Sequence, residues 1–380
     1  MVINALSYGT IIPLLYPYAA KFGMTAPGLA VLFASFSVAQ FIATPLMGRL
    51  SDVHGRKPLL VISIGGTALS LALFASATSI PLLFLARILD GITGGNASIA
   101  QAIIADTTKP AERAQAFGIL GAAFGFGFVF GPALATVTSG ISLTAPFWIA
   151  SGLALLATLA TIIFLPETNT KREKRSSAVS VLSPKVLFGT LRSPVLGKLF
   201  LVLILAFVGQ HAMIIAFQSF TVDTLKMNAQ QISMLFTAFG LVNVLIQGGG
   251  IKFLMQRTAD KLGLAFKSLL LATGTMLVVA AWQSFWPFVI FILLYGAIFA
   301  ITAPLLTSII SERTNAEDQG GIMGLSQAYQ SLAQVFGPLA AAALLLLAPK
   351  WVFVFTALCL AVAAVILRRE PAQVAASVDL

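Results

Sequence analysis

Residues 48–58 read Gly-Arg-Leu-Ser-Asp-Val-His-Gly-Arg-Lys-Pro and form a short charged segment between two long apolar runs. Most charged residues of the chain lie in short clusters of this kind. Because a charge is costly in hydrocarbon and inexpensive just outside it, such clusters mark where a chain leaves a lipid bilayer. The segment therefore indicates that the neighbouring runs, near residues 28–48 and 59–77, cross a membrane.

The composition extends this interpretation to the whole chain. Of its 380 residues, 58% are hydrophobic and 9% are charged, whereas a soluble domain carries roughly 25% charged residues. Only helices and closed β-barrels span a bilayer, because lipid offers no hydrogen-bond partner to an unpaired backbone group. The apolar runs are about 20 residues long, the length that a spanning helix needs, and they lack the alternation of barrel strands. We therefore predict an all-α membrane protein.

Charged residues, Pro and Gly divide the apolar sequence into twelve predicted transmembrane helices. They lie near residues 2–20, 28–48, 59–77, 81–105, 115–139, 145–165, 197–221, 229–250, 268–286, 287–311, 320–347 and 350–367. These helices form an N-terminal six-helix bundle (1–165) and a C-terminal six-helix bundle (197–367), with a linker (166–196) and a tail (368–380).

The basic residues are distributed unevenly between the two sides of these helices. Most of the 23 Lys and Arg residues lie in the loops on one side. Positive charge collects in the cytoplasmic loops of membrane proteins, so both termini and the linker are predicted to be cytoplasmic. The same distribution accounts for the net charge of +10 without a nucleic-acid partner. The partners expected are the lipid bilayer and a small-molecule substrate, and the protein is expected to be monomeric.

The two halves of the chain repeat one another. Val-Phe-Gly-Pro occurs at 129–132 and again at 335–338, and at the same offset Asp106 aligns with Glu312. Identities made only of Gly and Ala could arise by chance in an apolar chain, but this four-residue match is much less prone to do so. Each half is therefore predicted to be a six-helix unit of the same topology.

These features together resemble the major facilitator superfamily. Residues 48–58 match, at every characteristic position, the signature that this family carries between its second and third helices, Gly-x-Leu-Ser-Asp-x-x-Gly-Arg-Lys-Pro. The two six-helix halves and the basic linker are also features of the family. The resemblance covers the whole chain and implies two pseudo-symmetric six-helix bundles, which hold a substrate site between them and rock against each other.

Two further motifs make the chain similar to the tetracycline and multidrug proton antiporters of that family. Arg87 and Gly91 match the fourth-helix pattern Arg-x-x-x-Gly. Gly127, Gly131 and Pro132 match the fifth-helix antiporter motif, although the two glycines that usually close it are replaced here. The resemblance implies drug export in exchange for protons, and a bacterial inner membrane as the location.

One position departs from the related tetracycline exporters. Where they carry a membrane-embedded aspartate in the first helix, this chain has Asn4, and an amide cannot exchange a proton near neutral pH. If protons drive transport, the candidates to carry them are Asp90, with Arg87 on the same helix face, and His211. A permanent structural ion pair remains the alternative for Asp90 and Arg87, and a hydrogen-bonded packing role remains the alternative for His211.

The resemblance also implies a conformational latch on the cytoplasmic side. Arg56 is expected to pair with Asp106 at the end of the fourth helix, and Asp52 is expected to meet the amino-terminal end of another helix, whose dipole favours a carboxylate. Such a cluster would hold the two halves together in one conformation. The alternative is that these charges only anchor loops at the membrane surface. The predicted latch residues are Gly48, Asp52, Gly55, Arg56, Lys57, Asp106 and Arg113.

Amide and aromatic side chains within the predicted helices are candidates for a substrate cavity. Polar faces in lipid should point inward, toward a cavity or a neighbouring helix. A cavity of amides and aromatic rings with few charges suits a bulky amphipathic compound, although each aromatic ring taken alone could equally be packing. The predicted cavity residues are Asn4, Tyr8, Asn96, Phe124, Gln210, Phe217, Gln218, Asn243, Gln247, Tyr295, Phe299, Gln327, Tyr329, Gln330 and Gln334.

The sequence therefore predicts a secondary transporter rather than an enzyme. It contains neither a P-loop for ATP nor a nucleophile–base–acid constellation. The two His and the single Cys do not cluster, so no metal or other cofactor is expected, and a proton gradient is the expected driving force. The alternatives are a uniporter, a symporter, or a lipid or siderophore exporter of the same fold. From another class, the alternative is a non-transporting receptor or scaffold.

Overall fold

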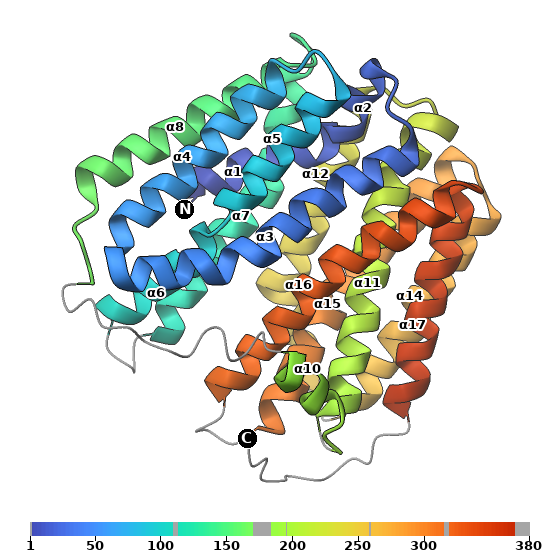
Figure 1. Cartoon of the computed structure of the whole chain (residues 1–380). Coiled ribbons are helices and arrows are strands. Elements are labelled where there is room, and N and C mark those ends of the chain that lie inside the picture. The colour runs from blue at the N-terminus through green and yellow to red at the C-terminus, as the bar shows by residue number, and fades with distance from the viewer. Residues whose placement is uncertain are drawn as a thin grey trace. The chain divides into compact units, whose positions relative to one another are not determined.

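The computed structural model describes residues 2–108, 113–169, 184–194, 196–257, 260–314 and 319–368. Within these ranges the chain is helical apart from short connections, as the predicted all-α class requires (Figure 1). The helices of the first half are α1 (Val2–Ile11), α2 (Leu15–Ala19), α3 (Ala26–His54), α4 (Arg56–Ala75), α5 (Ile80–Thr93), α6 (Asn96–Thr107), α7 (Arg113–Thr138) and α8 (Ala145–Phe164). Those of the second half are α10 (Pro184–Leu191), α11 (Gly197–Ser219), α12 (Ala229–Leu245), α13 (Ile251–Arg257), α14 (Lys261–Ala281), α15 (Phe285–Glu312), α16 (Gln319–Leu345) and α17 (Pro349–Arg368).

Nine helices among the described residues are long and apolar enough to cross a membrane. They are α3, α4, α8, α11, α12, α14, α15, α16 and α17, with α11 and α12 each extended by a π turn. The other three predicted spans contain α1 with α2, α5 with α6, and α7. The described residues therefore support the predicted count of twelve transmembrane helices only in part.

Two of these three spans are interrupted for local chemical reasons. Between α1 and α2 the chain passes through a 3₁₀ turn that contains Pro13, whose nitrogen cannot donate a helical hydrogen bond. Between α5 and α6 it passes through Gly94 and Gly95. A Cβ on Gly94 would lie 2.9 Å from the Gln40 amide nitrogen, and one on Gly95 would lie 2.6 Å from Met47 Cβ. The two glycines therefore let this connection press closely against α3.

Spatial contacts divide the chain into two compact units. The first comprises Met1–Ala178 with Lys226–Gly240, and the second comprises Val179–Leu225 with Leu241–Leu380. Within the first unit α1 packs against α7 and α8, and α4 packs against α5 and α8. Within the second unit α11 packs against α16 and α17, and α14 packs against α15 and α17. The same neighbours thus recur in the same order along the chain, in keeping with the internal repeat.

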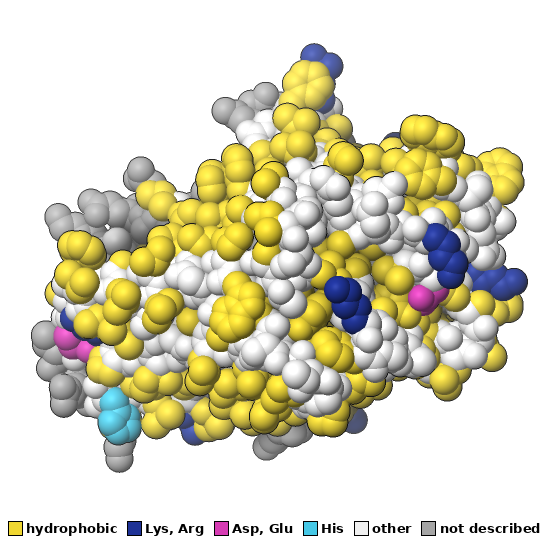
Figure 2. Space-filling model, turned by 90° about the horizontal axis from the view of Figure 1, so that it is seen from above, with side chains coloured by type: hydrophobic (Ala, Val, Ile, Leu, Met, Phe, Trp, Pro, Cys, Tyr) yellow, Lys and Arg dark blue, Asp and Glu magenta, His cyan; other side chains and the backbone are white. Residues whose placement is uncertain are grey.

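Large apolar side chains are exposed on many helices. Leu69 on α4, Leu85 on α5 and Ile163 on α8 expose 61%, 55% and 69% of their surfaces, and Leu358 on α17 exposes 59%. Hydrophobic side chains are spread widely over the face seen in Figure 2, where Lys, Arg, Asp and Glu are few. Such an exterior suits lipid rather than water, because soluble proteins rarely expose large contiguous apolar patches. The chain is an integral, multi-pass membrane protein.

Candidate functional site

A charged cluster forms where α3 ends and α4 begins. Arg56, the first residue of α4, is only 5% exposed. Its Nη1 atom lies 2.6 Å from Asp52 Oδ1, and its Nε atom lies 2.9 Å from Asp106 Oδ2 near the end of α6. Nη1 also donates a hydrogen bond of 2.7 Å to Ser51 Oγ. One guanidinium group therefore ties together the ends of three helices, and the expected pairing of Arg56 with Asp106 is present.

A third carboxylate, which the sequence placed only in the predicted linker, joins this cluster. Glu167 follows α8 and accepts hydrogen bonds from the backbone N–H groups of Arg56 (2.8 Å) and Lys57 (3.2 Å). Two residues further on, the Asn169 side-chain amide donates a hydrogen bond of 2.8 Å to the backbone carbonyl of Asp52. A Glu directly after a long apolar run was the available signal, but the sequence could not show what it contacts.

The structure gives less information on two other predicted latch residues, Gly48 and Arg113. Gly48 lies on α3, and a Cβ there would find no heavy atom within 4 Å. The side chain of Arg113 lies outside the described part of the chain. The structure thus assembles the Arg56 cluster within one unit, and its action as a latch remains a prediction.

The second unit contains a cluster in the corresponding place. Lys261 is the first residue of α14, as Arg56 is of α4, and it forms an ion pair with Glu312 at the end of α15. Asp260 caps this helix, because its Oδ1 atom accepts a 2.7 Å hydrogen bond from the Gly263 N–H. The alignment of Asp106 with Glu312 in the sequence therefore reflects two equivalent ion-pair positions.

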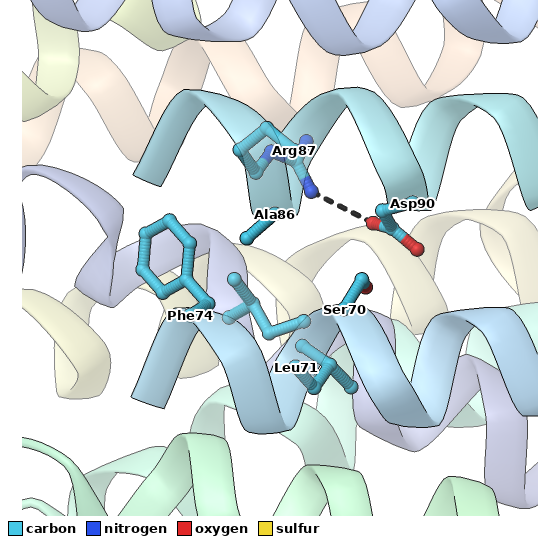
Figure 3. Close-up of a pocket in the computed structure, with 7 residues that line it drawn as sticks. Ser70, Leu71, Phe74, Ala86, Arg87 and Asp90 are labelled. Atoms are coloured by element: carbon cyan, nitrogen blue, oxygen red, sulfur yellow. Dashed lines mark hydrogen bonds and ion pairs between the residues drawn. The ribbon is translucent and has the colours of Figure 1, made fainter. Parts of the chain in front are cut away.

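A buried ion pair lies within the apolar part of α5 (Figure 3). Arg87 Nη1 is 2.9 Å from Asp90 Oδ2, and the two residues are 4% and 5% exposed. The Arg87 guanidinium also lies over the Phe36 ring of α3, 3.9 Å from its centroid. The pair lines a small pocket with Ile11, Ser70, Leu71, Phe74 and Ala86.

Hydroxyl groups on α4 supply the polar surroundings of this pair. Ser63, Thr67 and Ser70 follow one another at helical spacing and are all buried. Thr67 and Ser70 lie within hydrogen-bonding reach of the Asp90 side chain, and Ser70 points toward it in Figure 3. Of the acidic side chains in the described ranges, Asp90 is the one that is buried. This hydroxyl stripe was not among the sequence-based candidates, although its i, i+4, i+7 spacing could have revealed it.

The predicted antiporter-motif glycines lie where two helices touch through their backbones. A Cβ on Gly131 would lie 2.6 Å from the carbonyl carbon of Gly9, and one on Gly127 would overlap the backbone of Ala5. Pro132 lies inside α7, one residue after this contact. In the second unit Gly337 of α16 meets α11 similarly, since its Cβ would lie 2.7 Å from His211 Cβ. These glycines therefore allow α1 to pack on α7 and α11 to pack on α16.

Four of the predicted proton-coupling and cavity residues gather on α11 and α15. Tyr295 is fully buried and donates a 2.6 Å hydrogen bond to Gln210 Oε1. Its ring stacks on Phe299 with centroids 5.8 Å apart. His211 Nδ1 lies 2.8 Å from the Phe207 carbonyl of the preceding turn. This contact serves a packing histidine and a titrating one equally, so both interpretations remain.

Other predicted cavity residues have contacts that hold their own unit together. Phe217 is 3% exposed and packs against Phe288, with ring centroids 5.5 Å apart. Tyr329 is 1% exposed, and its hydroxyl donates a hydrogen bond of 2.7 Å to the Leu187 carbonyl. This hydrogen bond joins α10 to α16. Gln218 is fully buried on α11.

The remaining cavity candidates are more open or lie outside the description. Gln247 and Gln327 are exposed, whereas Asn96, Asn243, Gln330 and Gln334 are partly buried. The side chains of Asn4, Tyr8 and Phe124 lie outside the described part of the chain. A cavity built from these residues remains a prediction. Among the described residues no group of three His, Cys, Asp or Glu side chains could hold a metal ion.

Comparison with known proteins agrees with this architecture. The profile of the Major Facilitator Superfamily matches residues 1–266 and 199–378. The chain is 30% identical over 346 residues to the class E tetracycline resistance protein of Escherichia coli, covering 89% of this chain and 84% of that protein. It is 31% identical over 350 residues to the class G tetracycline resistance protein of Vibrio anguillarum, covering 90% and 87%. The crystal structure of the human organic anion transporter MFSD10 matches with a TM-score of 0.69 and 25% identity, covering 96% of both chains. The chain belongs to the Major Facilitator Superfamily.

Proposed function

We propose that this transporter exports a small, amphipathic, drug-like compound in exchange for protons, by exposing one site to the two sides of the membrane in turn. The support for export of a drug is the similarity to two tetracycline resistance proteins along most of the chain. The similarity in fold to a human organic anion transporter supports a small organic compound as the cargo. The amide and aromatic side chains named above would accommodate such a cargo.

The observation that carries proton exchange is the position of Asp90. A carboxyl group in the apolar part of a spanning helix is expensive to maintain, and such groups often mark ion or proton pathways. Asp90 is 5% exposed and has a cationic partner, Arg87, at 2.9 Å. It would take a proton from one side of the membrane and release it to the other, which Asn4 cannot do. His211 is the second candidate, because imidazole titrates near physiological pH.

The Arg56 cluster supports the conformational part of the proposal. Arg56 joins Asp52 and Asp106 in a buried arrangement at one end of the first unit. Such a cluster would hold one conformation until the helix ends separate. By the distribution of basic residues this end and both termini would be cytoplasmic. Relatives from Escherichia coli and Vibrio anguillarum favour a bacterial inner membrane as the location.

Everted membrane vesicles provide the test, with tetracycline as the probe. An acid interior should drive tetracycline uptake by vesicles that contain the protein, and Asp90→Asn should remove this gradient-driven component. Asp223→Asn is the matched control, because Asp223 is an exposed acid outside the apolar part of its helix. Its uptake should equal that of the unmodified protein.

Two results would overturn the proposal. Uptake that does not respond to the gradient would exclude proton exchange and favour a uniporter. Tetracycline binding without any flux in proteoliposomes would favour a non-transporting receptor. If tetracycline is not bound at all, the same vesicles test siderophores and lipids as cargo.

A further inference from the structure

The helix α4 begins without a cap from its own sequence. Its N-cap residue is Gly55, which has no side chain, and its first turn contains no acidic residue. The first N–H groups of a helix have no partner within the helix, and they carry the positive end of its dipole. Glu167 supplies both missing features, because its two oxygens accept from the N–H groups of Arg56 and Lys57.

Glu167 is itself held in place. Its Oε1 atom also accepts hydrogen bonds of 2.9 Å from the N–H groups of Thr168 and Asn169. Partial burial raises the pKa of Glu167, but the four backbone hydrogen bonds lower it more, so the net pKa lies below the ordinary value. The carboxylate is therefore ionised at neutral pH and can act as a permanent cap.

The glycine of the 48–58 segment is explained by the same contact. Gly55 has a φ of +105°, a conformation that L side chains rarely adopt. A Cβ at this position would also overlap the carboxylate of Glu167, with the Cδ atom at 2.9 Å. Gly55 therefore provides both the turn between α3 and α4 and the space that Glu167 occupies.

We propose that Glu167 is a positioning residue for Arg56, which it holds through the backbone of the first turn of α4. Arg56 then reaches Asp52 and Asp106 from a fixed starting point, and Asn169 fastens Asp52 from the same segment. This clasp, formed by Glu167 and Asn169, follows α8 and lies within the first unit. The residues after α8 are thus tied directly to the Arg56 cluster.

Amide hydrogen exchange of the purified full chain tests the clasp without a substrate. In Glu167→Ala the amides of Arg56 and Lys57 should exchange on the order of tenfold faster or more, because each loses a hydrogen bond to a charged group. Thr168→Val is the matched control, since it leaves the backbone of the clasp in place and removes a hydroxyl that has no partner among the described atoms. Equal exchange at Arg56 and Lys57 in Glu167→Ala and the unmodified protein would overturn the proposal.

Two further variants separate positioning from a general loss of stability. Glu167→Asp keeps the charge and should restore part of the protection of the Arg56 and Lys57 amides from exchange. Glu167→Gln should restore less, because its NH₂ group would face the N–H group of either Arg56 or Lys57 and cannot accept a hydrogen bond from it. If Glu167→Ala fails to fold, the comparison of Glu167→Asp with Glu167→Gln still tests whether Glu167 positions Arg56. Equal protection in both variants would show that the charge does not matter and would contradict the proposal.

A transport measurement then connects the clasp to Arg56. This arm rests on the proposed function and uses gradient-driven tetracycline uptake in everted vesicles. Glu167→Ala and Arg56→Ala should reduce uptake, and the double variant should be no worse than Arg56→Ala, because both changes remove one arrangement. Multiplied losses in the double variant would refute positioning through Arg56. Absence of uptake by the unmodified protein would sink the proposed function and leave the exchange result standing.

Discussion

Separating the two members of the buried Arg87–Asp90 pair should destabilise the protein more than removing both. In Asp90→Leu, Arg87 would remain 4% exposed, with its Nε atom unpartnered among the described atoms and Nη1 deprived of its 2.9 Å contact. Phe36 would be its main remaining partner, through the cation–π contact at 3.9 Å. That contact is worth about 0.5–2 kcal/mol, which does not replace a carboxylate.

The magnitude follows from the burial of both groups. Breaking a buried ion pair by removing one partner costs about 3–5 kcal/mol, because an uncompensated charge is left in a medium of low polarity. Asp90→Asn should cost less than Asp90→Leu, since an amide oxygen can still accept from Arg87. Replacing both residues, as in Arg87→Met with Asp90→Leu, should cost less than either single change, because no unpaired charge remains.

Denaturant unfolding of purified protein in one detergent measures these free energies. The expected coupling between Arg87→Met and Asp90→Leu is at least about 3 kcal/mol, because each single change costs about 3–5 kcal/mol and the double change costs less than either. Additive losses, within about 0.5 kcal/mol, would refute the argument that the two charges compensate each other. The double variant also resolves the remaining alternative. If it folds and still shows gradient-driven uptake, the pair is structural and another group carries the proton.

Two other expectations concern packing and pH. Gly131→Ala should lower the free energy of unfolding by about 1–3 kcal/mol, because the new methyl group would meet the backbone of Gly9 at 2.6 Å. Gly152→Ala on α8 is the control, because no heavy atom lies within 4 Å of the new methyl group, and it should be neutral or stabilising by about 0.5–1 kcal/mol. Equal effects of the two changes in thermal melts would contradict the close contact. The pKa of Glu167 is lowered in the folded protein, so its stabilising effect is complete above the ordinary carboxyl pKa of 4.5 and is lost as pH falls through the lower folded value. Melting temperatures of Glu167→Gln and the unmodified protein should therefore differ at neutral pH and converge in acid; a difference that grows in acid would reverse the sign.

Several features of the site could be predicted from short stretches of sequence. Arg87 and Asp90 are three residues apart, and helical geometry alone places such residues on one face. The pairing of Arg56 with Asp106 followed from the resemblance to a family. Both predictions concern side chains whose relation is set by helix geometry or by a recognisable motif.

Contacts between distant segments could not be predicted in this way. The antiporter motif indicates that Gly131 permits tight packing, but only the structure shows that Gly9 of α1 is the surface it meets. Tyr329 is predicted to line a cavity, and only the structure shows that its hydroxyl donates a hydrogen bond to the Leu187 carbonyl of α10. Both outcomes depend on how far each helix is rotated and shifted against its neighbour, which hydrophobicity does not encode.

The sequence by itself determined that the protein lies in a lipid bilayer, that its fold is all-α, and that its two halves repeat one another. An apolar composition with clustered charges leaves helices in lipid as the solution, because each spanning segment must satisfy its own backbone hydrogen bonds. Tertiary structure alone decided that Glu167 caps the helix begun by Arg56 and that Phe36 lies under Arg87. A helix forms from local hydrogen bonds, whereas these contacts join residues far apart in the chain and arise only when the helices pack.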